Sequence, residues 1–303
     1  MEDLTSAHVR GRRRKRRIFS VLAALAGVAL FAGCTANEAP SRKPRSPVAR
    51  DQDDDTSRAP PEDVEVELEP EPSSEELPPA GTDDEPTWCQ ESAADATFCA
   101  DFDRTLELGW TARGGAHGEA RLVQGGLSAP NAFAAQTEPV GDGIVARAYL
   151  RKDFAQAPQD EIDYTFAVRL EQVGALPNKG GTLAVLQVGK APDDYELQLN
   201  VASTGALVIM ERGPMVDGGP RRYVQHKLGS LAMRTWTRIS IRVKFGENSA
   251  FKASVDALEV LNDVRTVVPL PRIAPSLYVG ITYVDPPSAT WDVRYDDVVV
   301  QLR

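Results

Sequence analysis

Two pairs of aspartates stand near the two ends of the region expected to fold. Asp101 and Asp103 lie in one strand-like segment, and Asp296 and Asp297 lie in the last one. Carboxylate oxygens suit Ca²⁺, a hard ion that takes about 6–8 oxygen ligands. If these two segments are neighbours, the four aspartates are candidate ligands of a structural calcium ion. The alternative is four surface aspartates at strand ends.

A second candidate site combines arginine with tyrosine. Arg147, Tyr149 and Arg151 occupy one face of the strand expected over residues 145–152, and Tyr223 follows two arginines in a loop of similar character. Tyrosine offers a flat apolar face with a polar tip, and arginine offers planar donors that suit sugars and uronates. The four residues are therefore candidate glycan contacts, against the alternative of an ordinary solvated strand face.

No recognisable catalytic motif accompanies these residues. The chain has no Gly-x-Ser-x-Gly nucleophile motif, and neither His117 nor His226 has an assignable nucleophile or orienting partner. A polysaccharide lyase can use tyrosine with arginine or histidine, but no motif for one is apparent. The sequence favours a binding role and leaves enzymatic activity open.

Three cysteines occur, Cys34, Cys89 and Cys99. Cys89 and Cys99 stand close together at the start of the region expected to fold, where a bridge would close a short loop. In an oxidising compartment we expect these two to form a disulfide; two free thiols are the alternative.

The N-terminal segment indicates where the protein resides. Six basic residues, 12–17, precede an apolar run over 18–33 that is short for a membrane span and ends at Cys34. The last four residues of this segment, Phe-Ala-Gly-Cys, resemble the lipobox of bacterial lipoproteins. The resemblance implies that residues 1–33 are removed and that Cys34 is lipidated, which anchors the protein to a lipid bilayer of the cell envelope. Thr35 favours the outer membrane, and the export route, general or twin-arginine, stays open.

Charge is distributed unevenly after Cys34. Residues 34–87 are rich in Pro, Glu, Asp and Ser and hold few apolar side chains, as expected of a disordered acidic tether. Residues 88–303 carry 22 basic and 26 acidic side chains. A domain with this balance gives no electrostatic argument for a nucleic-acid partner.

From residue 88 onward, apolar and polar residues alternate in short segments. The clearest examples span residues 162–170, 195–201, 239–245 and 277–283. Period two with one polar face is typical of antiparallel strands packed on one side, so helix is expected to be scarce. About a dozen such strands in one domain predict an all-β, two-sheet antiparallel jelly-roll sandwich over 88–303. A change of phase at Asp296-Asp297 predicts a β-bulge there.

Three segments together resemble the concanavalin A-like lectin/glucanase superfamily, in particular laminin-G-like domains. They are residues 98–103 with Trp110, residues 126–133 and residues 295–300, and Trp236 ahead of a strand fits as well. The resemblance spans residues 97–303. It implies a jelly roll whose first and last strands are often neighbours, whose calcium site near that seam is structural, and whose concave face or rim loops bind glycans.

Glu161 and Asp163 resemble the start of the catalytic strand in a glucanase branch of the same superfamily. Retaining hydrolysis needs a second carboxylic acid as acid/base, and the two positions where that branch places it hold Thr165 and Phe166. We interpret the pair as charged residues at the start of a strand.

The sequence thus indicates a cell-envelope lipoprotein that presents a non-catalytic carbohydrate- or surface-binding jelly-roll domain. This function rests on analogy at the level of the fold, and one fold hosts many activities. Two alternatives stay open. One is a polysaccharide-active enzyme, either a glycoside hydrolase or a lyase, and the other is a protein-binding envelope scaffold.

Overall fold

The computed structural model describes residues 86–303, except 107, 175–178, 192 and 216–219. The predicted signal segment, the predicted lipidation site Cys34 and nearly all of the predicted tether lie outside the described residues. Within the described residues, no helix is long and apolar enough to cross a membrane.

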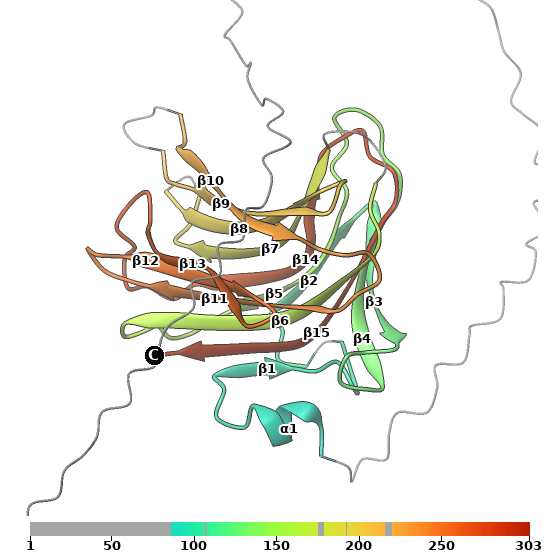
Figure 1. The fold of residues 1–303 in the computed structure, drawn as a ribbon, viewed down its shortest axis with the longest axis horizontal. Helices are drawn as coiled ribbons and strands as arrows, with labels where there is room; N and C mark the ends of the chain where they lie inside the picture. The colour runs from blue at the N-terminus through green and yellow to red at the C-terminus, as the bar shows by residue number, and fades with distance from the viewer. Residues whose placement is uncertain (1–85, 107, 175–178, 192, 216–219) are drawn as a thin grey trace, which may run out of the picture. The chain divides into compact units, whose positions relative to one another are not determined.

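Eight of the described strands form sheet A, in the order β13-β12-β11-β6-β15-β4-β3, with β1 paired to β15 (Figure 1). Their bounds are β1 Phe98–Ala100, β3 Gly118–Gln124, β4 Asn131–Thr137, β6 Glu161–Gln172, β11 Thr237–Lys244, β12 Ala250–Val255, β13 Leu258–Arg265 and β15 Trp291–Leu302. All of the pairings between these strands are antiparallel.

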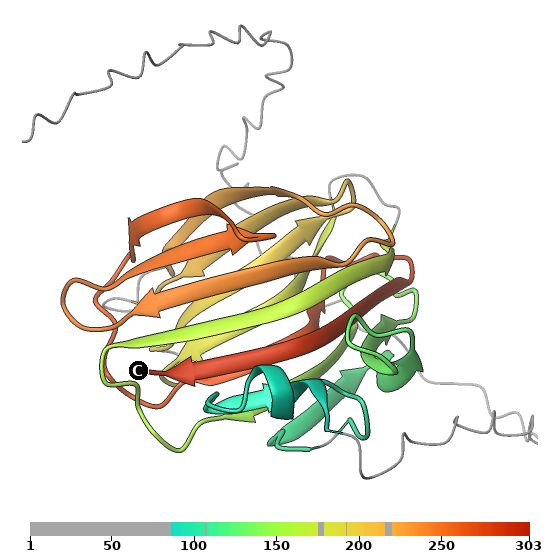
Figure 2. The same ribbon diagram turned by 60° about the horizontal axis from the view of Figure 1, so that its bottom comes forward.

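Seven further strands form sheet B, in the order β10-β9-β8-β7-β14-β5-β2. Their bounds are β2 Ala112–Ala116, β5 Arg147–Asp153, β7 Gly180–Val188, β8 Tyr195–Ala202, β9 Ala206–Arg212, β10 Tyr223–Ser230 and β14 Ser276–Val284. The described helix is α1, Trp88–Ser92, which lies with β1 beside β15 (Figures 1 and 2). The expectation of scarce helix therefore holds for the described residues.

The core lies between the two sheets and is built from alternate residues of each strand. In β6, Ile162, Tyr164 and Phe166 are buried, whereas Asp163 and Thr165 between them are partly exposed. The same alternation recurs in β8, β11 and β14, the other segments in which the sequence showed period two. The predicted two-sheet antiparallel jelly-roll sandwich is confirmed.

The first and last strands meet at a seam, as the resemblance implied. Cys89 of α1 and Cys99 of β1 form the predicted disulfide, with an S–S distance of 2.02 Å. β15 carries the predicted bulge, because its register against β6 shifts between Asp296 and Val299. Asp297 has a φ of 50°, in the left-handed region, which accommodates the extra residue of the bulge.

Near the β10 edge of sheet B, a buried carboxylate links this sheet to the segment that follows β13 of sheet A. Glu211 of β9 is fully buried and accepts hydrogen bonds from Tyr195 Oη at 2.9 Å and from the Val267 backbone N–H at 2.9 Å. Its other carboxylate oxygen lies 2.8 Å from His226 Nε2. Since a buried charge is tolerated only when it is paired and hydrogen-bonded, these three partners make Glu211 part of the fold.

We expect Glu211→Ala to lower the free energy of unfolding by about 3 kcal/mol, because Tyr195, His226 and the Val267 backbone N–H lose their common partner. Urea denaturation of the purified protein measures this loss. Glu247→Ala, at an exposed position, serves as the control and is expected to change stability by less than about 0.5 kcal/mol. A loss below about 1 kcal/mol in Glu211→Ala would contradict the structural role.

Candidate functional site

The face of sheet B that points away from sheet A carries the predicted glycan contacts of β5. Arg147, Tyr149 and Arg151 face outward there, because Ala146, Ala148 and Leu150 between and beside them are fully buried in the core. The strand expected over residues 145–152 is thus confirmed at 147–153, with the predicted side outward.

Outward residues of neighbouring strands line up with β5 in two cross-strand rows. The first row is Arg151, Tyr278, Val185, Gln198, Met210 and Gln225, and the second is Asp153, Ser276, Gln187, Glu196, Arg212 and Tyr223. We call these two rows, together with Tyr149 and Arg147, the polar face. Since neighbouring strands are about 4.8 Å apart, a row over six strands is roughly 24 Å long, which is the length of several linked sugars.

Two tyrosines and an arginine pack together on the β14–β5 part of the polar face. The ring centroids of Tyr149 and Tyr278 are 5.5 Å apart, and Arg151 Cζ lies 5.5 Å from the centroid of the Tyr278 ring. Asp153 Oδ1 accepts a hydrogen bond of 2.7 Å from Arg151 Nε, which orients the guanidinium and, by this bond, raises the pKa of Arg151. Burial raises the pKa of Tyr278, so its phenol stays protonated at neutral pH.

A glycine makes room for the Tyr149 ring. Gly114 of β2 pairs with Tyr149 across the sheet, and a Cβ at this glycine would lie 2.3 Å from Tyr149 Cζ. The ring of Tyr149 therefore lies directly over the β2 backbone, a position that any larger residue at 114 would block.

Next to the tyrosines, acidic and basic side chains pair around β8 and β9. Asp194, immediately before β8, is fully buried and accepts hydrogen bonds from Gln187 Nε2 at 2.7 Å and Arg221 Nη2 at 2.6 Å. Arg212 pairs with Glu196 and, at 3.5 Å, with Asp194. Burial raises the pKa of Glu196, whereas for Asp194 the hydrogen bonds from Gln187 and Arg221 outweigh burial and lower the pKa. Both arginines are therefore neutralised within the protein.

The structure separates the four predicted glycan contacts. Arg147, Tyr149 and Arg151 lie together on β5, but Tyr223 lies on β10, five strands away at the opposite edge of sheet B. Tyr223 is 57 % exposed and sits opposite Arg212 in the register. It belongs to the same face as the β5 residues without touching them.

Sequence reasoning missed most of the polar face. Tyr278, Gln187 and Glu196 are not among the predicted glycan contacts, although Tyr278 and Glu196 occupy polar positions of two segments in which apolar and polar residues alternate. The alternation already indicates that these side chains point outward, because the apolar residues on either side of them must face the core. The identity of the neighbouring strand was not available, since period two does not say which strands pair.

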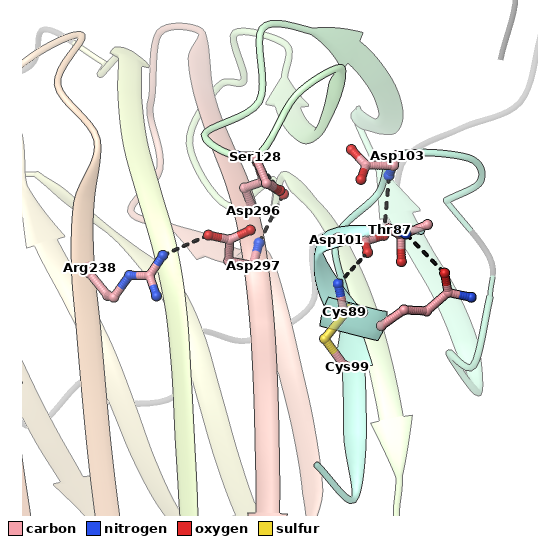
Figure 3. Close-up of a disulfide and its surroundings, with 10 residues drawn as sticks. Thr87, Cys89, Cys99, Asp101, Asp103, Ser128, Arg238, Asp296 and Asp297 are labelled. Atoms are coloured by element: carbon pink, nitrogen blue, oxygen red, sulfur yellow. Dashed lines mark hydrogen bonds and ion pairs between the residues drawn. A yellow bond between two sulfur atoms is a disulfide. The ribbon is translucent and has the colours of Figure 1, made fainter. Parts of the chain in front are cut away.

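The four predicted calcium ligands lie at the seam, where each of them has protein partners (Figure 3). Asp101 Oδ2 accepts a hydrogen bond of 2.9 Å from the Cys89 backbone N–H, and Asp297 Oδ2 pairs with Arg238 Nη2 at 2.6 Å. Asp296 Oδ2 accepts the backbone N–H groups of Leu127 and Ser128, at 2.6 and 3.0 Å, and so holds the loop before β4.

Burial raises the pKa of Asp103, Asp296 and Asp297. Burial, then the charge of Asp297, raises the pKa of Asp296 to about 8, and burial with the charge of Asp101 raises the pKa of Asp103 to about 6. One oxygen each of Asp103 and Asp297 is buried without a hydrogen-bond partner among the described residues. Over the same residues, no group of three or more His, Cys, Asp or Glu is arranged to hold a metal ion. The calcium site stays a prediction.

Glu161 and Asp163 pair with arginines on the outer side of sheet A. Arg242 Nη2 lies 2.7 Å from Asp163 Oδ2, and Arg303 Nη1 lies 3.5 Å from Glu161 Oε1. Thr165, at one of the two positions where an acid/base would be needed, shares a hydrogen bond of 2.7 Å with Ser240. These contacts agree with the interpretation of charged residues at a strand start.

Comparison with known proteins gives a fold class. No protein-family model matches the chain, and no curated protein matches its sequence. Among solved structures, an endo-β-1,4-glucuronan lyase from the fungus Trichoderma reesei matches with a TM-score of 0.53 and 15 % identity, over 69 % of this chain and 96 % of that chain.

Two further solved structures match less well. Alginate lyase vAL-1 from a Chlorella virus has a TM-score of 0.49 and 10 % identity, over 64 % of this chain and 93 % of that chain. The cellulose-induced protein Cip1 has a TM-score of 0.47 and 12 % identity, over 68 % of this chain and 97 % of that chain. Together with the topology, the glucuronan lyase match supports the fold of a two-sheet antiparallel jelly-roll sandwich.

The raised pKa of Asp296 predicts a pH-dependent stability. The folded state keeps this proton between the ordinary aspartate pKa of about 4 and about 8, while the unfolded state loses it, so stability falls as pH rises through this range. Melting temperatures measured in a chelator over this pH range test the trend. Asp296→Asn is expected to flatten the slope, and Asp142→Asn, at an exposed site, is expected to leave it unchanged.

The same melting experiment tests the calcium prediction. Calcium favours ionised carboxylates, so adding it at about pH 8 should raise the melting temperature, and Asp297→Ala should remove this gain. Equal melting temperatures with calcium and with chelator would contradict the calcium site, without bearing on the pH slope of Asp296.

Proposed function

We propose that the polar face binds an acidic polysaccharide and cleaves it by β-elimination. The observation that carries this proposal is the cluster of Tyr149, Tyr278 and Arg151, in which two phenols and a guanidinium meet on an outward face. Arg151 uses its Nε atom for Asp153, and its two Nη atoms have no hydrogen-bond partner among the described residues. They are therefore available for the planar, bidentate recognition of a carboxylate.

β-Elimination at a uronate needs three contributions that this cluster contains. A cation or hydrogen-bond donor on the sugar carboxylate makes the neighbouring C5–H acidic, which is a role for Arg151. A base takes the C5 proton, and an acid gives a proton to O4 as the C4–O4 bond breaks and a C4–C5 double bond forms. Tyr149 is assigned both transfers: as the phenolate it takes the C5 proton, and the phenol so formed gives that proton to O4 as the C4–O4 bond breaks, which restores the phenolate.

The fold comparison supports this proposal over a purely binding function. A solved structure that matches with a TM-score of 0.53 carries the name of a glucuronan lyase, and the match covers 96 % of that chain. Among the functions that the sequence left open, a polysaccharide-active enzyme therefore receives more support than the non-catalytic module. The length of the polar face also suits a chain of sugars better than a small ligand.

We expect Tyr149→Phe to lower cleavage at least about 100-fold while leaving binding within about threefold, because it removes one hydroxyl and keeps the ring. Glucuronan and alginate are the test polymers, and the release of unsaturated ends by the purified protein is the measurement. Tyr283→Phe, at the far end of β14, is the matched control and should retain cleavage within about twofold.

The possible outcomes separate the candidate functions. Saturable binding of a polymer without unsaturated products would contradict catalysis and leave the non-catalytic binding module. Absence of both binding and cleavage for acidic polymers would contradict the glycan function of the polar face and favour the protein-binding scaffold. Full cleavage by Tyr149→Phe would remove Tyr149 from the reaction.

We further propose that the domain is tethered to the outer membrane of a bacterial cell envelope. The support is the basic and apolar N-terminal segment that ends at Cys34, followed by the acidic, proline-rich residues to 87. Processing at Cys34 would leave a lipid-anchored domain on a long spacer, placed to reach a polymer at the surface.

Cys34→Ala is expected to shift the protein from the membrane fraction to the soluble fraction of the envelope, because the lipid attachment site is lost. Fractionation and the mass of the mature protein are the measurements. An unchanged membrane fraction together with an unchanged mass would contradict lipidation. Cys89→Ala is not a suitable control, since it breaks the disulfide, and Ser41→Ala serves instead.

A further inference from the structure

A chain of three hydrogen-bonded side chains crosses the centre of the polar face. Tyr278 Oη lies 3.1 Å from Gln187 Oε1, and Gln187 Nε2 lies 2.7 Å from Asp194 Oδ2. Asp194 is fully buried, while Gln187 and Tyr278 are half-buried. The chain therefore runs from a buried carboxylate to a phenol at the ligand-binding surface.

The chemistry of Asp194 fixes the direction of every hydrogen bond in this chain. Its carboxylate is ionised, since Gln187 and Arg221 both donate to it and its pKa is lowered. An ionised carboxylate only accepts, so the amide nitrogen of Gln187 must face Asp194. The amide oxygen of Gln187 then faces Tyr278, and because this oxygen only accepts, the Tyr278 hydroxyl must donate its proton to it.

A hydroxyl that donates inward offers only its lone pairs to a ligand. The Tyr149 hydroxyl differs, because it has no hydrogen-bond partner among the described residues and is free to donate or accept. The two phenols, whose ring centroids lie 5.5 Å apart, therefore differ in the hydrogen bonds that they can make to a ligand. Tyr278 can only accept, whereas Tyr149 can donate or accept.

We propose that Asp194 and Gln187 are positioning residues that fix Tyr278 as a hydrogen-bond acceptor, so that the polar face selects a uronate whose ring hydroxyl on C2 or C3 is free. The carboxylate pairs with Arg151 and the sugar hydroxyl donates to Tyr278. Tyr149 is then the one phenol of the pair that can give a proton to the leaving oxygen. This inference rests on the proposed function and adds to it the chemical requirement on the substrate.

O-Acetylation of the polymer tests this requirement. An acetyl ester replaces the donor hydroxyl with groups that only accept, and an acceptor facing the Tyr278 lone pairs is left unpaired. We therefore expect the wild-type protein to bind and cleave unacetylated polyuronate at least about tenfold better than the O-acetylated form of the same polymer.

Gln187→Met removes the amide that orients the Tyr278 hydroxyl while keeping a side chain of similar size. Methionine has a similar length but no polar amide, so the Tyr278 hydroxyl can turn outward and donate to an acetyl carbonyl. The preference for unacetylated polymer should then fall to about twofold or less. Gln136→Met, on sheet A and away from the polar face, should keep the wild-type preference. An unchanged preference in Gln187→Met would overturn the proposal.

A second measurement does not depend on any polysaccharide. With ¹³C-labelled tyrosine, the Cζ resonance of Tyr278 is assigned by its loss in Tyr278→Phe and followed against pH. Loss of the acceptor that holds the phenol proton should lower the pKa of Tyr278 in Gln187→Met. An unchanged pKa would overturn the hydrogen-bond polarity. If no polymer is bound or cleaved, the proposed function fails while this titration still decides the polarity.

Discussion

The period of the β-strand is the constraint on which the rest of this structure depends. Once alternate residues of a strand are committed to the core between two sheets, the residues between them must face outward. In β5 the burial of Ala146, Ala148 and Leu150 fixes the direction of Tyr149 and Arg151. The register then aligns outward residues of neighbouring strands into rows, so the polar face is a consequence of how the core is packed.

Buried charges in this domain are each given partners that determine their position. Glu211 is held by Tyr195, His226 and a backbone N–H. Asp194 is held by Gln187 and Arg221. Because an unpaired buried charge is costly, each of these groups constrains several strands or loops at once. The hydrogen bonds that these two carboxylates require therefore fix the neighbouring strands and loops at two places, one inside the sandwich and one beneath the polar face.

The polar face differs along its length in what it presents to a ligand. At β5 and β14 the two Nη atoms of Arg151 have no hydrogen-bond partner within the described part of the chain and lie beside two tyrosine rings. Farther along, Arg212 of β9 is paired with Glu196, and Arg221, between β9 and β10, is paired with Asp194. The Nη atoms of Arg151 therefore make the tyrosine end the place for a sugar carboxylate, where the proposed reaction takes place. The paired end is suited to hydrogen bonds with neutral hydroxyl groups.

The sequence by itself determined the elements that depend on local pattern. Alternation over 162–170 and 277–283 predicted strands and their buried sides, the phase change at Asp296-Asp297 predicted the bulge, and the spacing of Cys89 and Cys99 predicted the disulfide. The outward direction of Arg147, Tyr149 and Arg151 followed in the same way. All of these properties are decided within a strand or a short loop, where the periodicity of the backbone is visible in the sequence.

Tertiary structure alone decided which of these strands are neighbours. Tyr149 meets Tyr278 because β5 pairs with β14, and Tyr278 reaches Gln187 because β14 also pairs with β7. Period two says which side of a strand a residue occupies, but not which strand lies beside it, since that choice depends on the packing of the whole sandwich. The tyrosine cluster and the hydrogen-bonded chain from Tyr278 to Asp194 result from pairing between segments far apart in the sequence. For this reason no local pattern in the sequence predicts them.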